Sequence, residues 1–87
     1  MNDLQSIIED LDEEAVVLTG LDNCVIGTAE NHSMNRVLVY SVDRIIRKLM
    51  MRDDMSLTEA VEFFSFNIEG AHLGVYDPIY LYNEIEP

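Results

Sequence analysis

The sequence predicts a small α+β domain: a small antiparallel sheet of three strands plus a late fourth, covered by a helical hairpin, with an amphipathic helix at the N-terminus. Three observations predict this class. β-Branched residues gather in short runs between residues 15 and 40. Apolar residues recur at helical spacing between residues 42 and 69. With 87 residues, 48% of them hydrophobic, the chain has room for one core, so residues 1–87 are predicted to be a single domain.

A helix is predicted over residues 3–12. Its apolar residues are spaced i, i+3, i+4 and i+7, which forms one stripe of an amphipathic helix: Leu4, Ile7, Ile8 and Leu11. The segment ends in "DLDEE", and acids at a helix C-terminus oppose its dipole, so we expect the last turn to fray.

Three strands are predicted over residues 15–40. "EAVVLTG" and "NCVIGTAE" flank "GLDN", whose glycine, aspartate and asparagine are typical turn residues, so residues 15–30 are predicted to be a β-hairpin. "NHSMN" then interrupts the chain, and "RVLVY" is the third strand. Cys24 is predicted to be a small packing residue rather than a reactive thiol, because no histidine is near it in sequence.

A helical hairpin is predicted over residues 42–69. Ser41 is placed to cap the first helix, and Ser56 with Glu59 forms a capping box at the start of the second. The predicted apolar faces are Val42, Ile45, Ile46, Leu49 and Met50 on the first helix, and Leu57, Val61, Phe64 and Ile68, with Ala60 beside them, on the second.

Two expectations follow from this arrangement. Consecutive helical positions diverge by about 100°, so Phe63, Phe64 and Phe66 cannot all face the same core. One of Phe63 and Phe66 is therefore expected at an edge or an interface. The last strand is predicted over residues 79–85, and the sheet face away from the hairpin is expected to be covered by the first helix or by another subunit.

Charge is the strongest global feature. Seventeen acids against five basic residues give a net charge of −12, beyond the magnitude of about 2–8 that suits solubility in a small domain. Such a surface repels nucleic acid and anionic lipid and attracts basic proteins, so we expect a basic protein partner and neither direct nucleic-acid nor membrane binding. The alternative is that the acids serve only solubility. A single cysteine, no long apolar run and no signal-peptide pattern predict a cytoplasmic protein.

Two sets of residues are candidates for contact with a partner. One is the acidic stretch after the first apolar stripe, and the other is a tyrosine pair on one side of the last strand: Glu9, Asp10, Asp12, Glu13, Glu14, Tyr80 and Tyr82. The alternative for the tyrosines is a sheet face packed under a helix. Self-association is a further expectation, because the basic residues of one helix could meet that acidic stretch in a second copy: Arg44, Arg47, Lys48 and Arg52.

Catalytic signatures are missing from the sequence. There is no Ser-His-Asp set, P-loop or dinucleotide-binding turn, and "EGAH" is a single copy of a spacing that metal sites use in pairs. We therefore predict no enzymatic activity, no cofactor, no metal and no catalytic residue. The alternative is a small-ligand binder or enzyme with a pocket formed by Asp22, Asn23, Tyr40, Asn67 and Glu69.

Several segments resemble a family of short proteins from tailed bacteriophages and prokaryotic genomes. They are "DNCVIG", "VLVYSVDRIIRKLMMRDDMSLTEAVEFFSFNIEGAHLG" and "DPIYL", and the resemblance covers residues 15–82. Asp54 stands where the family pattern has glycine, and Cys24 where it has alanine. These proteins carry no assigned activity, so the resemblance implies an accessory protein of viral origin, acting in the host cytoplasm, and assigns no catalytic residue. A purely structural or assembly subunit is the remaining alternative.

Overall fold

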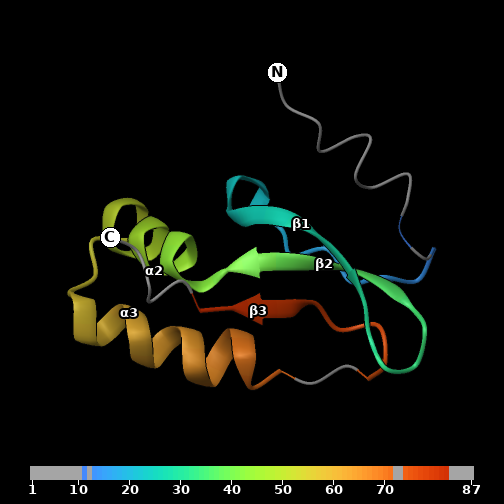
Figure 1. The fold of residues 1–87 in the computed structure, drawn as a ribbon. Coiled ribbons are helices and arrows are strands. Elements are labelled where there is room, and N and C mark those ends of the chain that lie inside the picture. Colours follow the sequence, from blue (N-terminus) through green and yellow to red (C-terminus); the bar gives the residue numbers. More distant parts are fainter. Residues whose placement is uncertain (1–10, 12, 72–73, 83–87) are drawn as a thin grey trace.

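The computed structural model describes residues 11, 13–71 and 74–82. They form an α+β fold with a three-stranded mixed sheet and two helices, which confirms the predicted class (Figure 1). The elements in chain order are a 3₁₀ turn (Asp22–Cys24), β1 (Val25–Glu30), β2 (Arg36–Ser41), α2 (Val42–Arg52), α3 (Leu57–Phe63), a π-helix (Phe64–Glu69) and β3 (Ile79–Leu81).

The sheet has the order β1-β2-β3, with β2 in the centre. β1 pairs with β2 antiparallel, but β3 pairs with β2 parallel, so the prediction of a purely antiparallel sheet is wrong. The reason lies in the connection. Parallel neighbours need a crossover of a dozen or more residues, and the two helices between β2 and β3 supply it. The chain therefore returns to the starting end of β2 before it enters the sheet again.

The hairpin lies later in the chain than predicted. Its strands are β1 and β2, which match the second and third predicted strands, and its loop is "NHSMN". Asn31 builds this loop, because its side-chain oxygen accepts from the backbone N–H of Ser33 at 2.9 Å and of Asn35 at 3.1 Å. "GLDN" is instead the entry to the 3₁₀ turn.

The segment predicted as the first strand, residues 15–19, is irregular. Its β-branched sequence suits a strand, but both edges of β2 are occupied, by β1 and by β3. Its backbone is bonded elsewhere: the N–H of Val16 donates to the carbonyl of Tyr76 at 3.1 Å, and that of Leu18 to the hydroxyl of Tyr40 at 2.9 Å. The sheet therefore has three strands, not four.

Both predicted helix caps are present. The Ser41 hydroxyl accepts from the N–H of Arg44, so one residue ends β2 and begins α2. At α3 the Ser56 hydroxyl accepts from the N–H of Glu59 at 3.1 Å, while the Glu59 carboxylate accepts from the N–H of Ser56 at 2.8 Å. These reciprocal bonds satisfy two N–H groups that a helix start leaves without intrahelical partners.

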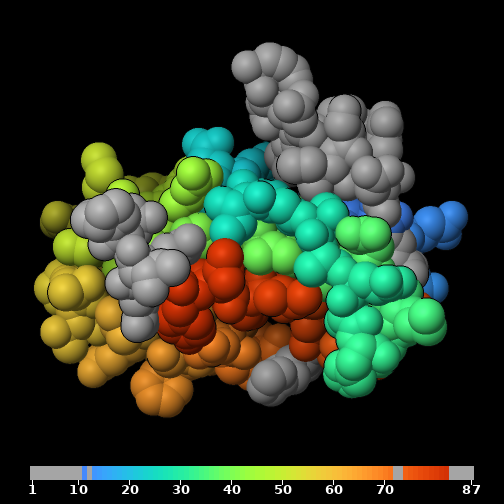
Figure 2. All heavy atoms as spheres, viewed as in Figure 1, coloured from blue at the N-terminus to red at the C-terminus, as the bar shows by residue number. Residues whose placement is uncertain are grey.

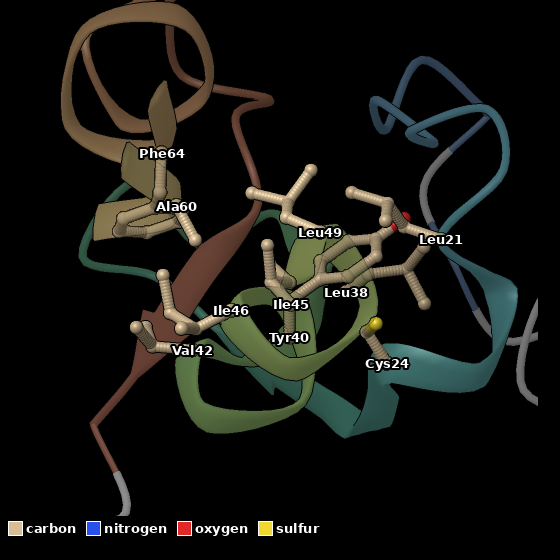
Figure 3. Close-up of a cluster of buried hydrophobic side chains, with 10 residues drawn as sticks. All are labelled: Leu21, Cys24, Leu38, Tyr40, Val42, Ile45, Ile46, Leu49, Ala60 and Phe64. Carbon is tan, nitrogen blue, oxygen red and sulfur yellow. The ribbon is translucent and has the colours of Figure 1, made fainter. Parts of the chain in front are cut away.

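The core lies between β2 and the helices (Figure 3). Its buried members come from the loop and 3₁₀ turn before β1, from β2, from α2, from α3 and from the start of the π-helix: Leu21, Cys24, Leu38, Tyr40, Val42, Ile45, Ile46, Leu49, Ala60 and Phe64. The apolar stripe predicted for the second helix is only partly buried: Phe64 and the adjacent Ala60 are buried, whereas Leu57 and Val61 are 59% and 44% exposed. Val37, which alternates with Leu38 along β2, is also fully buried.

Some predictions fall on residues outside the described part of the chain. The helix predicted over residues 3–12 is one of them, apart from Leu11, which is half-buried and packs against the core. The last strand, predicted over residues 79–85, ends at Leu81 in the structure, and residues 83–85 lie outside the described ranges.

The π-helix requires a glycine at its end, which gives a test of this element. A Cβ at Gly70 would lie 2.9 Å from the backbone carbonyl oxygen of Ser65, closer than real Cβ atoms approach, whereas a Cβ at Gly27 would meet nothing within 4 Å. We expect Gly70→Ala to lower the free energy of unfolding by about 1–3 kcal/mol, since the helical turn must shift. Gly27→Ala should change it by at most about 0.5 kcal/mol. Urea unfolding followed by circular dichroism measures both, and equal effects would contradict the close approach.

Candidate functional site

Tyr40 lies at the centre of the molecule and connects three of its parts. It is fully buried on β2, and its hydroxyl accepts from the backbone N–H of Leu18. Its ring lies 6.3 Å from that of Tyr80 on β3, and the Tyr80 ring meets Phe64 edge-on at 5.3 Å. Tyr40 thus joins the irregular segment to the sheet, and Tyr80 continues the contact to the helices.

An apolar pocket of about 310 Å³ opens beside these rings. It lies between the irregular segment, the end of α2, the α3–π-helix region and the residues before β3. Leu21, Leu49 and Pro78 are its buried members. The other lining residues are Val16, Leu18, Thr19, Arg52, Phe63, Asn67, Ile68, Ala71, Asp77 and Tyr80. Apolar walls with a few polar groups are typical of a binding pocket.

A second, more open hollow of about 540 Å³ lies along the outside of α3, and we call it the acidic groove. Four carboxylates line it together with exposed apolar side chains: Asp53, Asp54, Met55, Glu59, Glu62, Phe63, Phe66 and Asn67. Phe66 is 79% exposed and Phe63 37%, as expected for side chains that cannot both reach the core. The groove therefore combines negative charge with accessible aromatic surface.

The carboxylates of the acidic groove differ in their partners. Asp53 pairs with Arg52, whose Nε and Nη2 lie 3.1 Å from its two oxygens, and this hydrogen bonding lowers the pKa of Asp53. Glu59 is used in the capping box. Within the described ranges Asp54 and Glu62 make neither an ion pair nor a hydrogen bond through their side chains, so their charge is available to a partner.

Asp54 also has an unusual backbone conformation. Its φ of 57° lies in the left-handed region, where glycine, asparagine and aspartate are the best tolerated residues. The conformation turns the chain sharply between α2 and α3, and it places the Asp54 side chain in the groove.

The pocket residues predicted from the sequence are only partly brought together. Asn67 lines both the apolar pocket and the acidic groove. Tyr40 lies beneath the pocket wall, bonded to Leu18. Asp22 and Asn23 are exposed on the 3₁₀ turn and do not line the pocket, although their neighbour Leu21 does. Glu69 lies apart from it and accepts a 2.7 Å hydrogen bond from the Tyr82 hydroxyl.

The predicted partner-contacting residues have mixed placements. Glu9, Asp10 and Asp12 lie outside the described residues, while Glu13 and Glu14 are exposed. The two predicted tyrosines lie on the same side of the chain, because both rings meet Phe64 edge-on, Tyr80 at 5.3 Å and Tyr82 at 6.4 Å. Tyr80 is half-buried, whereas Tyr82 is 50% exposed and offers more surface to a partner.

Sequence analysis missed most of the site. Asp53, Asp54, Glu59 and Glu62 are an obvious acidic set only once α3 is placed, and the pocket joins residues from four separate segments. The one available signal was the surplus of phenylalanines in "FFSF", which correctly predicts an exposed aromatic side chain.

The basic residues of α2 largely serve the fold. Arg44 and Arg52 donate to the carbonyls of Asn23 and Gly20, at 3.3 and 3.4 Å, and hold the loop before β1 against the helix. Arg47 pairs with Asp43 at 3.0 Å, which is the intrahelical pair expected from their spacing. Arg47 remains well exposed, so it is the residue of this set that is most available for contact with a second copy.

Cys24 is almost fully buried, and this burial raises the pKa of its thiol, as expected for a packing residue rather than a nucleophile. Among the described residues no group of three or more histidines, cysteines and acids is arranged to hold a metal ion. In the same residues no helix has the length and apolar character needed to cross a membrane.

Comparison of this chain with family models, with curated proteins and with solved structures finds no match. The pocket and the groove are therefore interpreted from their own geometry and chemistry.

The Tyr40 hydroxyl gives a test of how the pocket is held. We expect Tyr40→Phe to lower the free energy of unfolding by about 1–3 kcal/mol, because the Leu18 N–H loses its acceptor. Tyr82→Phe removes the same atom from an exposed hydrogen bond and should cost at most about 0.5 kcal/mol. Urea unfolding compares the two variants. Equal losses of unfolding free energy in the two variants would show that the buried hydrogen bond contributes no more to stability than the exposed one.

Alkaline pH provides a second test. Burial raises the pKa of Tyr80 from 10.0 to about 12, and it also raises the pKa of Tyr40. Since the unfolded chain releases these protons first, the free energy of unfolding should fall as pH rises from about 10 to about 12. Tyr80→Phe removes one such group, so its unfolding free energy should fall less steeply over that range. Chemical unfolding at a series of pH values measures this, and parallel curves for the two proteins would contradict it.

Proposed function

We propose that this chain is a small protein-binding module whose acidic groove takes a basic segment of a partner protein. Its resemblance to short bacteriophage proteins supports a viral accessory role in the host cytoplasm, and a nucleic-acid-handling host factor is a class of partner with the required basic charge. The net charge of −12 favours rapid encounter with such a protein.

The observation that carries this proposal is the composition of the groove. Asp54 and Glu62 have no side-chain ion pair within the described ranges, and Phe66 beside them is 79% exposed. Carboxylates that repel one another gain electrostatic energy when lysine or arginine approaches, and an exposed aromatic ring adds apolar contact area. Exposed aromatics serve no purpose for solubility, so they favour binding over a merely solubilising surface.

The acidic stretch predicted over residues 9–14 is part of this proposal as a second contact. Half-buried Leu11 packs against the core, which suits an amphipathic segment with its apolar side on the domain. Glu13 and Glu14 are exposed, so they add negative charge to the surface that a basic partner would approach.

Self-association, as in an assembly subunit, is the second candidate. It is supported by an apolar hollow of about 460 Å³ between α2 and α3, which is separate from the acidic groove. Leu57, Val61 and Tyr82 line it and are 59%, 44% and 50% exposed. A second copy covering this hollow would remove three apolar side chains from water, which favours association.

The groove is tested by removing two of its charges without changing side-chain size. We expect Asp54→Asn with Glu62→Gln to weaken binding of basic peptides selected from a random display library by about tenfold or more at low salt, since each lost contact is worth about 1 kcal/mol. Asparagine tolerates the left-handed backbone of residue 54, and Glu59 is left unchanged to preserve the cap. Fluorescence anisotropy measures the dissociation constants.

Glu13→Gln with Glu14→Gln is the matched control, because it also removes two negative charges, but from the other acidic surface. Loss of affinity only in the control would place the contact on residues 9–14. If neither variant weakens binding, or if selection on the wild type enriches no lysine or arginine, the proposal is wrong. Sedimentation equilibrium in the same buffers reports the oligomeric state of the free protein.

A further inference from the structure

The apolar pocket and the acidic groove are neighbouring parts of one surface. Phe63 and Asn67 line both of them, so a ligand that follows the groove reaches the mouth of the pocket. In Figure 2, the space-filling view from the side of Figure 1, the α3 and π-helix atoms (yellow to orange) border those of β3 (red) directly. The two hollows therefore meet at the stretch of chain between Phe63 and Asn67.

We propose that the apolar pocket receives one bulky apolar side chain of the same partner segment whose basic residues occupy the acidic groove. This inference rests on the proposed function and names the partner more closely: a short segment in which lysine or arginine flanks a leucine, methionine or aromatic residue. Such an anchor in a well-packed pocket is the usual source of affinity at an interface, while flanking charges steer its approach.

The lining of the pocket fits such an anchor. Leu18, Leu21, Leu49, Ile68 and Tyr80 provide apolar contact. Its volume of about 310 Å³ has room for one bulky side chain.

The charge around the pocket favours a peptide over an anionic metabolite. Asp53 already binds the one guanidinium in the pocket lining, that of Arg52, through both of its oxygens, and Asp77 adds a carboxylate to the lining. With the surplus of acids in the whole chain, phosphates and carboxylates are repelled, whereas an uncharged side chain flanked by cations is attracted.

Asn67 supplies a polar contact where the two hollows meet. It is exposed, and its side-chain amide makes no hydrogen bond to the described residues. A carboxamide both donates and accepts, as a peptide group does, so it can bond the backbone of an extended segment on either side of the anchor. A metal cation would use only the carbonyl oxygen of this group.

The test starts from the peptides selected on the wild-type protein. We expect them to share a bulky apolar residue among their basic ones, and its replacement by alanine to raise the dissociation constant about thirtyfold, as for a typical hot-spot side chain. This change is made in the peptide, so it does not depend on the folding of a protein variant.

The matching protein variant fills the pocket. Thr19→Trp places a large ring at an exposed lining position, and it should weaken the anchored peptide about thirtyfold while leaving its alanine version unchanged. Thr58→Trp is the control, because Thr58 is equally exposed on α3 but lines neither hollow. Thr58→Trp should change the affinity neither for the anchored peptide nor for its alanine version. Circular dichroism tests whether Thr19→Trp and Thr58→Trp are folded.

The outcomes separate this inference from the proposed function. If Asp54→Asn with Glu62→Gln weakens both peptides but neither the alanine replacement nor Thr19→Trp has an effect, the groove binds basic segments and the anchor is wrong. If selection enriches no basic residues, the proposed function fails first. If the peptides fail while a neutral small molecule raises the Tm of the wild type and not of Thr19→Trp, the pocket is a small-ligand site and the inference is overturned.

Discussion

The hydrogen bond from the Leu18 N–H to the buried hydroxyl of Tyr40 is the constraint on which the rest of the structure depends. Residues 15–19 are not paired in the sheet, so their backbone must find partners elsewhere or remain with water. By binding Leu18, Tyr40 fixes this segment against the central strand. One wall of the apolar pocket is thereby held in place, and Tyr80 and Phe64, which pack next to Tyr40, extend the same contact to β3 and α3.

The π-helix has a comparable role on the opposite side of the pocket. A π-helix is rare and is often found at functional sites, because its wider turn displaces side chains from their regular helical positions. Here it carries Asn67 and Ile68 into the pocket lining. The close approach of Gly70 to the Ser65 carbonyl oxygen excludes a side chain at position 70 unless the backbone shifts. The crossover from β2 to β3 thus makes the parallel strand pair and also builds the surface that we propose as the binding site.

Charge is distributed so that the fold and the proposed function use different residues. Arg44 and Arg52 hold the loop before β1 through its carbonyls, and Arg52 also neutralises Asp53. Two other acids, Asp54 and Glu62, lie in the acidic groove beside the exposed ring of Phe66. Concentrated like charge destabilises a folded domain, and a basic partner would relieve that repulsion. The same surface therefore explains why a small acidic domain would gain from binding.

The sequence by itself determined the features that depend on neighbours along the chain. Caps at Ser41 and Ser56, the helices that follow them, the strands 25–30 and 36–41, and the packing role of Cys24 all follow from local pattern and chemistry. Only the tertiary structure decided that residues 15–19 stay outside the sheet, that β3 runs parallel, and that Ala60 rather than Leu57 faces the core. These features depend on contacts between distant segments, namely which strand edges are occupied and in which direction the crossover returns to the sheet. The pocket and the groove depend on the same contacts, because their lining residues come from distant segments.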